Sequence, residues 1–357
     1  MSQTIEQLYH RIEELTPNRI NLMEVCGTHT VAISRLGIRS RLPHKLRLLS
    51  GPGCPVCVSP AGYIDSLIEI ALQPGTTLTT FGDLLRVPGS VRSLKQAVAS
   101  GAKVKVLYSP LEALEFARQN SGVEVVFAAV GFETTLPTIA ATIIQAEQSG
   151  IVNLSFLMAG RLAVPAMSAL LQTNDVRIDG FICPGHVSVV TGSDAFKTIV
   201  ERFAVPCAIT GFEAVDILSS IISLLEMKNN SEASVVNNYL RAVKPGGNLI
   251  ARQLMEQVFD VVDSEWRGIG VIPASGVKLK AAYSRFDAEA KFGISIEKQL
   301  SHPVGCSCGE VMRGLLLPDE CPLFGNACEP SSPVGPCMVS TEGACAAYYN
   351  YGQSGRI

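Results

Sequence analysis

The sequence has few charged residues, few aromatic residues and no long apolar run. Only 17% of its 357 residues are Asp, Glu, Lys or Arg, and only 6% are aromatic. The net charge of −3 gives no general attraction to nucleic acid or to an anionic membrane. No apolar stretch approaches the roughly 20 residues that a membrane-spanning helix needs, and the N-terminus has no signal-peptide core. We therefore expect a cytoplasmic protein with neither nucleic acid nor membrane as a partner.

The usual motifs of nucleotide-binding proteins and serine hydrolases are missing too. Neither G-x-G-x-x-G nor G-x-x-x-x-G-K-[ST] occurs between a predicted strand and a predicted helix. No nucleophile elbow of the G-x-S-x-G kind follows a predicted strand either. The sequence therefore supports no conventional dinucleotide site, P-loop or serine hydrolase, and no substrate turnover of a familiar kind is evident.

What the sequence does contain is a regular alternation of apolar strands and amphipathic helices. Hydrophobic residues make up 47% of the chain, which is enough for a large core. From about residue 20 to 225 the alternation is typical of parallel α/β units, and eight strands suit two sheets of about four. The predicted strands are 21–25, 46–50, 76–81, 103–108, 123–130, 152–159, 178–183 and 206–210.

Two similar segments support a division into two halves. Residues 125–135 (VVFAAVGFETT) and 205–215 (VPCAITGFEAV) each read as a strand, then Gly-Phe-Glu, then a helix. Ligands of open parallel sheets bind outside the carboxyl ends of the strands. The repeat therefore places Glu133 and Glu213 at that edge, one in each half, although two short apolar strings can also resemble each other by coincidence.

The character of the chain changes after residue 230. Helices are predicted over 233–243 and 247–262, and a tail rich in Cys, Gly and Pro follows. Such a tail cannot bury much apolar surface, so its cysteines are expected to hold it together. The predicted organisation has four parts: an N-terminal helix that packs with the C-terminal domain (1–20), two α/β domains (21–130 and 131–230) and a helical, cysteine-rich domain (231–357).

The eleven cysteines fall into separate groups along the chain. Disulfide frameworks are rare in the cytoplasm, which keeps thiols reduced, so two separate thiol sites are expected instead. Cys183 and Cys207 lie alone, and the sequence assigns them no role. The early group is Cys26, Cys54 and Cys57, and the late group is Cys306, Cys308, Cys321, Cys328, Cys337 and Cys345.

The first thiol, Cys26, begins the segment CGTHTVAI directly after a predicted strand. A thiol in a strand-to-helix turn is stabilised as thiolate by the helix N-terminus. We expect Thr28 to cap this helix and His29 to lie within reach of the same pocket. The alternative is a buried cysteine that only packs.

The segment GPGCPVC (51–57) places Cys54 and Cys57 after the next strand. A zinc site would need a second Cys or His pair nearby in the sequence, and none is there. A redox dithiol or a pair of iron ligands needs only a partner that the fold brings in. Two further edge segments, GFETT (131–135) and PGHVS (184–188), add Glu133 and His186, for which a purely structural role also stays open.

Four cysteines of the tail are separated by six, eight and seven residues, starting from Cys321. Loop cysteines interleaved with Pro and Gly suit a cubane iron–sulfur cluster, and zinc is the alternative. Cys306 and Cys308 point to opposite faces if their segment is extended, so at most one is expected to share the site.

Taken together and in this order, the motifs resemble those of the HypD family of hydrogenase maturation factors. The resemblance covers essentially the whole chain. It is carried by CGTHT (26–30), GPGCPVC (51–57), GFETT (131–135), PGHVS (184–188), GFEAVDIL (211–218) and CPLFGNACEPSSPVGPCMVSTEGACAAYY (321–349).

The resemblance implies a scaffold for assembling the Fe(CN)2(CO) group of nickel–iron hydrogenases. It implies a small partner, HypC, and cyanide supplied by HypE with HypF. The implied fold has two similar α/β domains facing each other across a cleft and a third domain with a [4Fe–4S] cluster. The implied cluster ligands are Cys321, Cys328, Cys337 and Cys345.

For the remaining site residues the resemblance implies a division of roles. Cys26 matches the iron-site cysteine, and Cys54 and Cys57 match the C-x-x-C pair, a redox dithiol beside the iron that can also ligate it. Glu133 and His186 would then support the iron site from the same cleft. A free-standing iron–sulfur oxidoreductase acting on protein disulfides is the alternative from another class, and a zinc-stapled binding module is a third.

Overall fold

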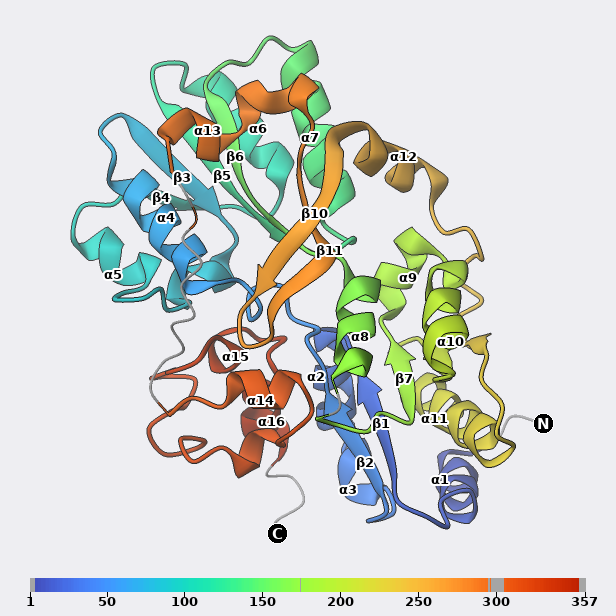
Figure 1. Ribbon diagram of the computed structural model, residues 1–357. Helices are drawn as coiled ribbons and strands as arrows, with labels where there is room; N and C mark the ends of the chain where they lie inside the picture. Colours follow the sequence, from blue (N-terminus) through green and yellow to red (C-terminus); the bar gives the residue numbers. More distant parts are fainter. Residues whose placement is uncertain (1–3, 174, 295, 297–304, 353–357) are drawn as a thin grey trace.

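The frame of the molecule consists of two parallel β-sheets (Figure 1). The computed structural model describes residues 4–173, 175–294, 296 and 305–352. The first sheet has the order β2-β1-β7-β8-β9, with β1 (Ile20–Glu24), β2 (Leu46–Ser50), β7 (Gly180–Cys183), β8 (Cys207–Ile209) and β9 (Val235–Asn237). The second has the order β4-β3-β5-β6, with β3 (Thr76–Thr80), β4 (Val104–Val106), β5 (Glu124–Gly131) and β6 (Leu154–Gly160). The predicted α/β class with two parallel sheets, and all eight predicted strands, are confirmed.

Helices cover both faces of each sheet, as parallel strands require. Helices of the first half of the chain are α1 (Ile5–Glu14), α2 (Gly27–Arg35), α3 (Ile38–Arg41), α4 (Ala61–Leu72), η1 (Gly82–Arg86), α5 (Leu94–Ala99), α6 (Pro110–Gln119), α7 (Leu136–Gln148) and α8 (Ala163–Gln172). Those of the second half are α9 (Gly185–Thr191), η2 (Ser193–Phe196), α10 (Lys197–Phe203), α11 (Ala214–Asn229), α12 (Leu249–Val258), η3 (Ala281–Phe286), α13 (Ala288–Phe292), α14 (Cys308–Met312), η4 (Pro318–Glu320), α15 (Pro336–Val339) and α16 (Ala344–Tyr351).

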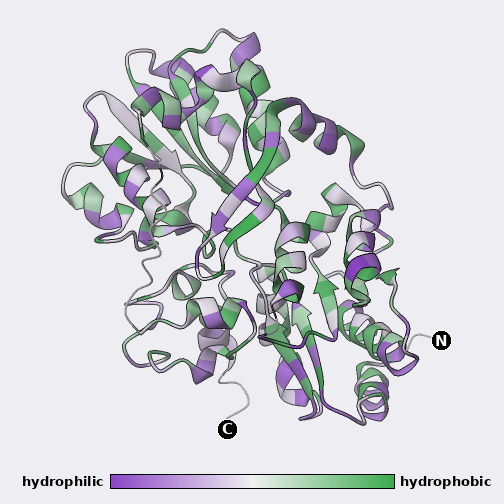
Figure 2. Ribbon diagram, viewed as in Figure 1, coloured by the Kyte–Doolittle hydropathy of each residue, from purple (hydrophilic) through white to green (hydrophobic). Residues whose placement is uncertain are grey.

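Strand β5 shows why these apolar runs form central strands. Its successive side chains point to opposite faces, and both faces are buried. Val125 and Phe127 join one hydrophobic cluster, whereas Val126 and Ala128 join the cluster on the other face. A strand covered on both sides reads as a continuous apolar run, as β5 does in the sequence, and Figure 2 shows green segments in strands of both sheets.

The two lone cysteines belong to the core of the first sheet. Cys183 on β7 and Cys207 on β8 are fully buried in one hydrophobic cluster with Phe181 and Ile209. A cysteine in such a place behaves as a small apolar side chain. Their position therefore accounts for them as packing residues.

The chain is divided between the two sheets differently from the predicted boundaries at 21–130 and 131–230. Strands β1 and β2 pair in parallel with each other, and β7 pairs with β1 through Leu22 opposite Gly180. The chain thus forms β1 and β2 of the first sheet, then the whole second sheet, and returns to the first sheet at β7. Apolar periodicity reveals where strands occur, but strand pairing depends on contacts between residues more than a hundred positions apart.

The region after residue 230 differs from its predicted helices. Strand β9 occupies the start of the segment 233–243, and the segment 247–262 holds α12 followed by a strand. The strands β10 (Phe259–Trp266) and β11 (Gly270–Leu279) form an antiparallel hairpin that lies against β6. The helix prediction failed because the hairpin gains its burial from tertiary contacts with the second sheet, which local periodicity does not show.

The N-terminal helix also packs elsewhere than predicted. Helix α1 lies against α11, whereas the prediction over 1–20 had it pack with the C-terminal domain; among the described residues α11 is its main neighbour. Leu8 and Ile12, four residues apart on one face of α1, share a buried cluster with Ile221. Arg11 adds an ion pair to Glu226 at 3.0 Å. Some residues of these predictions lie outside the described ones: 1–3 of the N-terminal helix, 174 of the predicted domain 131–230, and 295, 297–304 and 353–357 of the predicted domain 231–357.

The cysteine-rich tail is held by polar contacts to η1, which follows β3 of the second sheet, as well as by packing. The Arg86 guanidinium donates to the carbonyl of Val339 at 3.1 Å, and the Ser340 hydroxyl donates to Asp83 at 3.0 Å. Helix α16 lies against α2. Within the described ranges, no helix is long and apolar enough to cross a membrane.

The packing of α1 gives a first prediction. Replacing Ile12 by Ala should lower the free energy of unfolding by about 2–4 kcal/mol, because the side chain is fully buried between α1 and α11. Replacing Ile5, which is 40% exposed on the same helix, by Ala should change it by less than about 0.5 kcal/mol. Chemical denaturation of both variants measures the difference, and equal effects would contradict the packing described here.

Candidate thiol site

Cys26 lies where the sequence predicts it, in the turn between β1 and α2. It is the residue before the first turn of α2, and its backbone is extended. Thr30 Oγ1 contacts the carbonyl of Cys26 at 3.2 Å and donates to Glu24 at 2.8 Å. The expected cap by Thr28 is not formed, because Thr28 Oγ1 donates instead to Glu342 Oε1 at 2.9 Å.

The thiol of Cys26 is buried, with 8% of the residue exposed. Burial raises the pKa of this thiol to about 12, and the charges of Glu342 and Glu24 add to that effect. The backbone N–H groups of His29 and Thr28 act in the opposite direction and do not outweigh burial. The thiolate expected at this helix N-terminus is therefore not the favoured form.

The glycine-rich loop GPGCPVC packs directly on the Cys26 turn. The N–H of Gly51 donates to the carbonyl of Glu24 at 2.7 Å, and the N–H of Gly27 donates to the carbonyl of Gly53 at 3.0 Å. A methyl group on Gly53 would lie 2.4 Å from the nitrogen of Cys26 and 2.5 Å from its Cα. Only glycine allows the two backbones to approach so closely.

Cys54 and Cys57 are joined as a disulfide within this loop, with Cα atoms 5.3 Å apart. Both residues are buried, and the N–H of Cys57 lies 3.1 Å from the sulfur of Cys54. In this disulfide form neither sulfur is a thiolate, so neither is available as a thiolate ligand of a metal ion.

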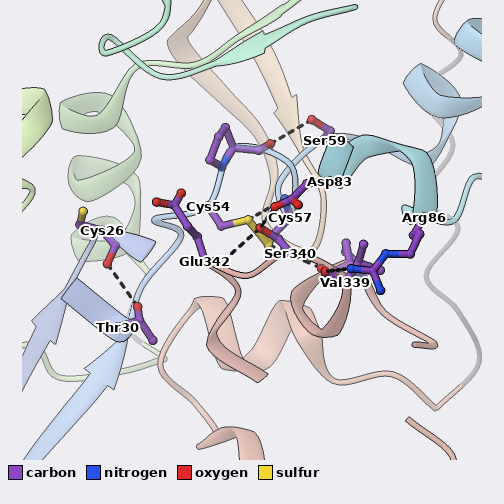
Figure 3. Close-up of a disulfide and its surroundings, with 12 residues drawn as sticks. Cys26, Thr30, Cys54, Cys57, Ser59, Asp83, Arg86, Val339, Ser340 and Glu342 are labelled. Carbon is purple, nitrogen blue, oxygen red and sulfur yellow. Dashed lines mark hydrogen bonds between the residues drawn. A yellow bond between two sulfur atoms is a disulfide. The ribbon is translucent and has the colours of Figure 1, made fainter. Parts of the chain in front are cut away.

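The tail brings Glu342 to the Cys26 turn, a residue that the sequence analysis did not single out. Figure 3 shows its side chain between Cys26 and the disulfide. A methyl group on Gly27 would lie 2.5 Å from Glu342 Cβ, so the two segments are in direct contact. The sulfur of Cys57 also lies 3.7 Å from the carbonyl of Pro336, next to Cys337. The only sequence signal was the position of Glu342 within the last of the motifs, STEGAC.

Five of the six tail cysteines line one small pocket. The sulfurs of Cys306 and Cys308 are 3.2 Å apart, and a methyl group on Gly335 would meet both. The sequence-based expectation that they point to opposite faces is wrong, because Ser307 is not extended and Cys308 begins α14. Cys337 interacts with the thiol of Cys308. The pocket is lined by Cys306, Cys308, Cys321, Leu323, Phe324, Cys328, Met338 and Cys345.

His186 is linked to the Cys26 turn through two aromatic contacts. The exposed ring of His186 and the buried ring of His29 both lie against Phe212, with centroids 4.3 Å and 4.6 Å from it. His29 also contacts the carbonyl of Gly211 at 3.0 Å, and burial lowers its pKa to about 4. His29 is therefore a neutral, packed side chain, and His186 is the histidine that solvent can reach.

Glu133 lies apart from the thiols. It accepts a hydrogen bond from the N–H of Ala163 at 2.9 Å, and burial raises its pKa to about 7. Its other oxygen has no hydrogen-bond partner among the described residues. It lines a pocket of about 470 Å³ together with residues of α9 and α12, such as Val190 and Met255. The structure thus brings Cys26, Cys54 and Cys57 together, with His186 nearby, while the carboxyl group of Glu133 faces a different pocket.

Comparison with known proteins identifies the family. A family model described as HypD, hydrogenase formation hypA family, matches residues 3–352. The chain belongs to the HypD family of hydrogenase maturation factors. It is 46% identical over 359 residues to the hydrogenase maturation factor HypD of Azotobacter vinelandii, covering 98% of this chain and 94% of that one. It is also 46% identical over 355 residues to HypD of Escherichia coli K12, covering 98% and 95% of the two chains.

A less similar member of the family matches over nearly the same length of this chain. The HypD of Cupriavidus necator is 41% identical over 351 residues, covering 96% of this chain and 92% of its own. The relatives thus match this chain from the N-terminal helix to the cysteine-rich tail, and the resemblance inferred from the motifs is confirmed at the level of the family.

The close approach at Gly53 gives a second prediction. Replacing Gly53 by Ala should displace the GPGCPVC loop from the Cys26 turn, because the atoms that a methyl group would meet are backbone atoms. We expect a loss of about 1–3 kcal/mol in the free energy of unfolding and faster reduction of the Cys54–Cys57 disulfide. Gly122, with no atom within 4 Å of the added methyl group, is the matched control. Unchanged stability of the Gly53 variant would show that the loop does not rest on Cys26.

Proposed function

We propose that this protein is the scaffold on which the Fe(CN)2(CO) group of nickel–iron hydrogenases is assembled. The observation that carries the proposal is that three sulfur-bearing segments lie next to one another: the Cys26 turn, the Cys54–Cys57 loop and the cysteine-rich tail. Cys26 lies under the C-x-x-C loop, and the disulfide of that loop touches the segment that bears Cys337. An iron-binding thiol, a redox pair and a cysteine-rich centre are the parts that such an assembly needs.

Cys26 is the proposed iron ligand. Ferrous iron that carries cyanide and CO is a soft centre, for which thiolate is a suitable protein ligand. Forming the iron–sulfur bond displaces the proton of the thiol, and Glu24 and Glu342 are the carboxylates whose charges act on this thiol. Burial raises the pKa of Glu24 to about 7, so its carboxylate is able to take up that proton near neutral pH.

The partners follow from the exposure of this thiol and from the family. A small partner, HypC, would present a second thiol to the iron and leave the remaining positions open for cyanide and CO. HypE, charged by HypF, would deliver the cyanide. Because Cys26 is only 8% exposed, the partner or the cargo must displace part of what covers it, and the neighbouring segments at this turn are the Gly53 loop and Glu342 of the tail.

Cys54 and Cys57 are the proposed redox pair. Opening the disulfide to two thiols takes two electrons and two protons, which an external electron donor and solvent would supply. The reverse step returns both electrons to the iron site or to an acceptor. The two sulfurs lie on a loop fixed to Cys26, so this change of state occurs beside the iron ligand.

The tail cysteines suit a [4Fe–4S] cluster. A cubane takes one thiolate on each of its four irons, so the ligands must surround a small space and not converge on one ion. Five of the six tail cysteines line a space of this kind, whereas no three Cys, His, Asp or Glu side chains form a single-ion site within the part of the chain described. When bound, the cluster would supply electrons one at a time. We assign its ligands to Cys321, Cys328, Cys337 and Cys345.

A free-standing disulfide reductase is the second candidate. The contact between Cys57 and the carbonyl of Pro336 places the disulfide beside the tail, as either function would need. A disulfide reductase does not require a third thiol such as Cys26 under the same loop, or a carboxylate beside that thiol. Loss of Cys26 would therefore leave a reductase active and would abolish a scaffold.

The cluster assignment is tested by replacing each tail cysteine with Ala in protein purified without oxygen. Loss of Cys321, Cys328, Cys337 or Cys345 should remove most of the iron and sulfide, because each ligand holds one iron. Loss of Cys306 should leave both nearly unchanged. If Cys306→Ala or Cys308→Ala removes the cluster and Cys321→Ala does not, the ligand set is the group around α14.

The iron site is tested by infrared spectroscopy of the protein copurified with HypC. Cys26→Ala should remove the cyanide and CO bands and leave the iron and sulfide of the tail in place. Cys183→Ala, another buried cysteine, is the matched control and should keep the bands. Bands of full intensity in the Cys26 variant would refute the assignment, and absence of such bands from the unmodified complex would refute the scaffold itself.

A further inference from the structure

A buried arginine lies between the disulfide loop and the cysteine-rich tail. Arg267 follows β10, at the tip of the β10–β11 hairpin, and only 4% of it is exposed. Its backbone N–H donates to the carbonyl of Val58 at 2.8 Å, the residue after Cys57. Figure 1 shows the tip of the hairpin reaching toward the tail helices.

The next residue fixes the tip against the tail. Gly268 has a φ of +80° and packs on Gly309, where an added methyl group would lie 2.6 Å from the Cα of Gly309. Gly309 directly follows Cys308. Trp266, on the other side, is fully buried and donates from its ring nitrogen to the Ser275 hydroxyl at 2.8 Å. The guanidinium is therefore carried on a rigid support.

The charge of Arg267 is incompletely paired. One terminal nitrogen donates to the carbonyl of Pro88 at 2.8 Å, whereas Nε and Nη1 have no partner within the described residues. Burying a guanidinium without an opposite charge is costly, so a site of this kind favours an anionic neighbour. The groups whose charges act on it are Cys308, Cys306, Cys337 and Asp65, and three of these four are tail cysteines.

We propose that Arg267 is a positioning residue that holds a fixed positive charge beside the iron–sulfur centre and raises its reduction potential. The inference rests on the proposed cluster. Four thiolates give a cubane centre a net negative charge, and reduction adds one more electron. A nearby positive charge stabilises the reduced form more than the oxidised form, and it does so strongly where burial excludes water. The same arginine therefore favours electron uptake at a point that lies next to the Cys54–Cys57 disulfide.

The experiment is a redox titration of anaerobically purified protein with dithionite, followed by electron paramagnetic resonance of the reduced cluster. Arg267→Gln should shift the ratio of oxidised to reduced cluster at least tenfold toward the oxidised form at a fixed potential. For one electron this corresponds to a midpoint lowered by about 59 mV. Arg267→Lys keeps the charge and should stay within threefold of the unmodified protein.

Arg161 provides a matched control. It is 5% exposed, donates to the carbonyl of Glu265 near the same hairpin and also has an unpaired Nε among the described residues. The charges acting on it are those of Tyr63 and Glu265. Arg161→Gln should therefore leave the midpoint unchanged even if it destabilises the fold, which thermal unfolding reports separately.

The possible outcomes separate the inference from the function on which it rests. An unchanged midpoint in Arg267→Gln with full iron and sulfide would overturn the inference and leave the cluster proposal intact. If Arg267→Gln loses the cluster while Arg267→Lys and Arg161→Gln retain it, the charge is needed to hold the anionic centre, which supports the inference. Unmodified protein without iron and sulfide would overturn both.

Discussion

The backbone contact between Gly53 and Cys26 determines how the thiol groups are arranged. Two neighbouring strands, β1 and β2, end at the same edge of the first sheet, and each is followed by a thiol segment. With glycine at position 53 the loop after β2 lies flat on the turn after β1. The disulfide in that loop is thereby held at a constant position relative to Cys26, and the tail then packs on the outer side of the loop through Pro336.

Burial has a consequence for the chemistry of this arrangement. A thiol with a pKa raised to about 12 is protonated at neutral pH and is a poor nucleophile, so Cys26 is protected from oxidation and from exchange with the neighbouring disulfide. Binding of a metal reverses this condition, because the cation replaces the proton. In the proposed function the site would therefore be inert when empty and would become a strong ligand only when iron is delivered. That behaviour suits a scaffold more than a general thiol reductase, which needs an exposed thiolate.

The sequence alone was enough to predict the features that depend on residues close together in the chain. Apolar runs such as residues 125–130 revealed the buried strands, and the position of Cys26 directly after a strand placed it at the correct edge of a sheet. The features that it missed depend on contacts between distant segments. Glu342 reaches the Cys26 turn across more than three hundred residues, and the pairing of β1 with β7 spans about half that distance. Neither contact leaves a periodic signal in the chain.

The tail depends on the rest of the molecule for its structure. It lies on four supports: the disulfide loop, the Cys26 turn, η1 and the tip of the β10–β11 hairpin. A segment so rich in Gly, Pro and Cys buries little apolar surface alone, so these supports stabilise the tail as a core stabilises an ordinary domain.

The hairpin is the support that packs on the second sheet and also carries a buried charge. Because its tip touches both Val58 and Gly309, a displacement of the tail also disturbs the segment that follows the disulfide. The cysteine-rich tail and the loop of the Cys54–Cys57 disulfide are thus parts of one packed unit, joined by backbone contacts.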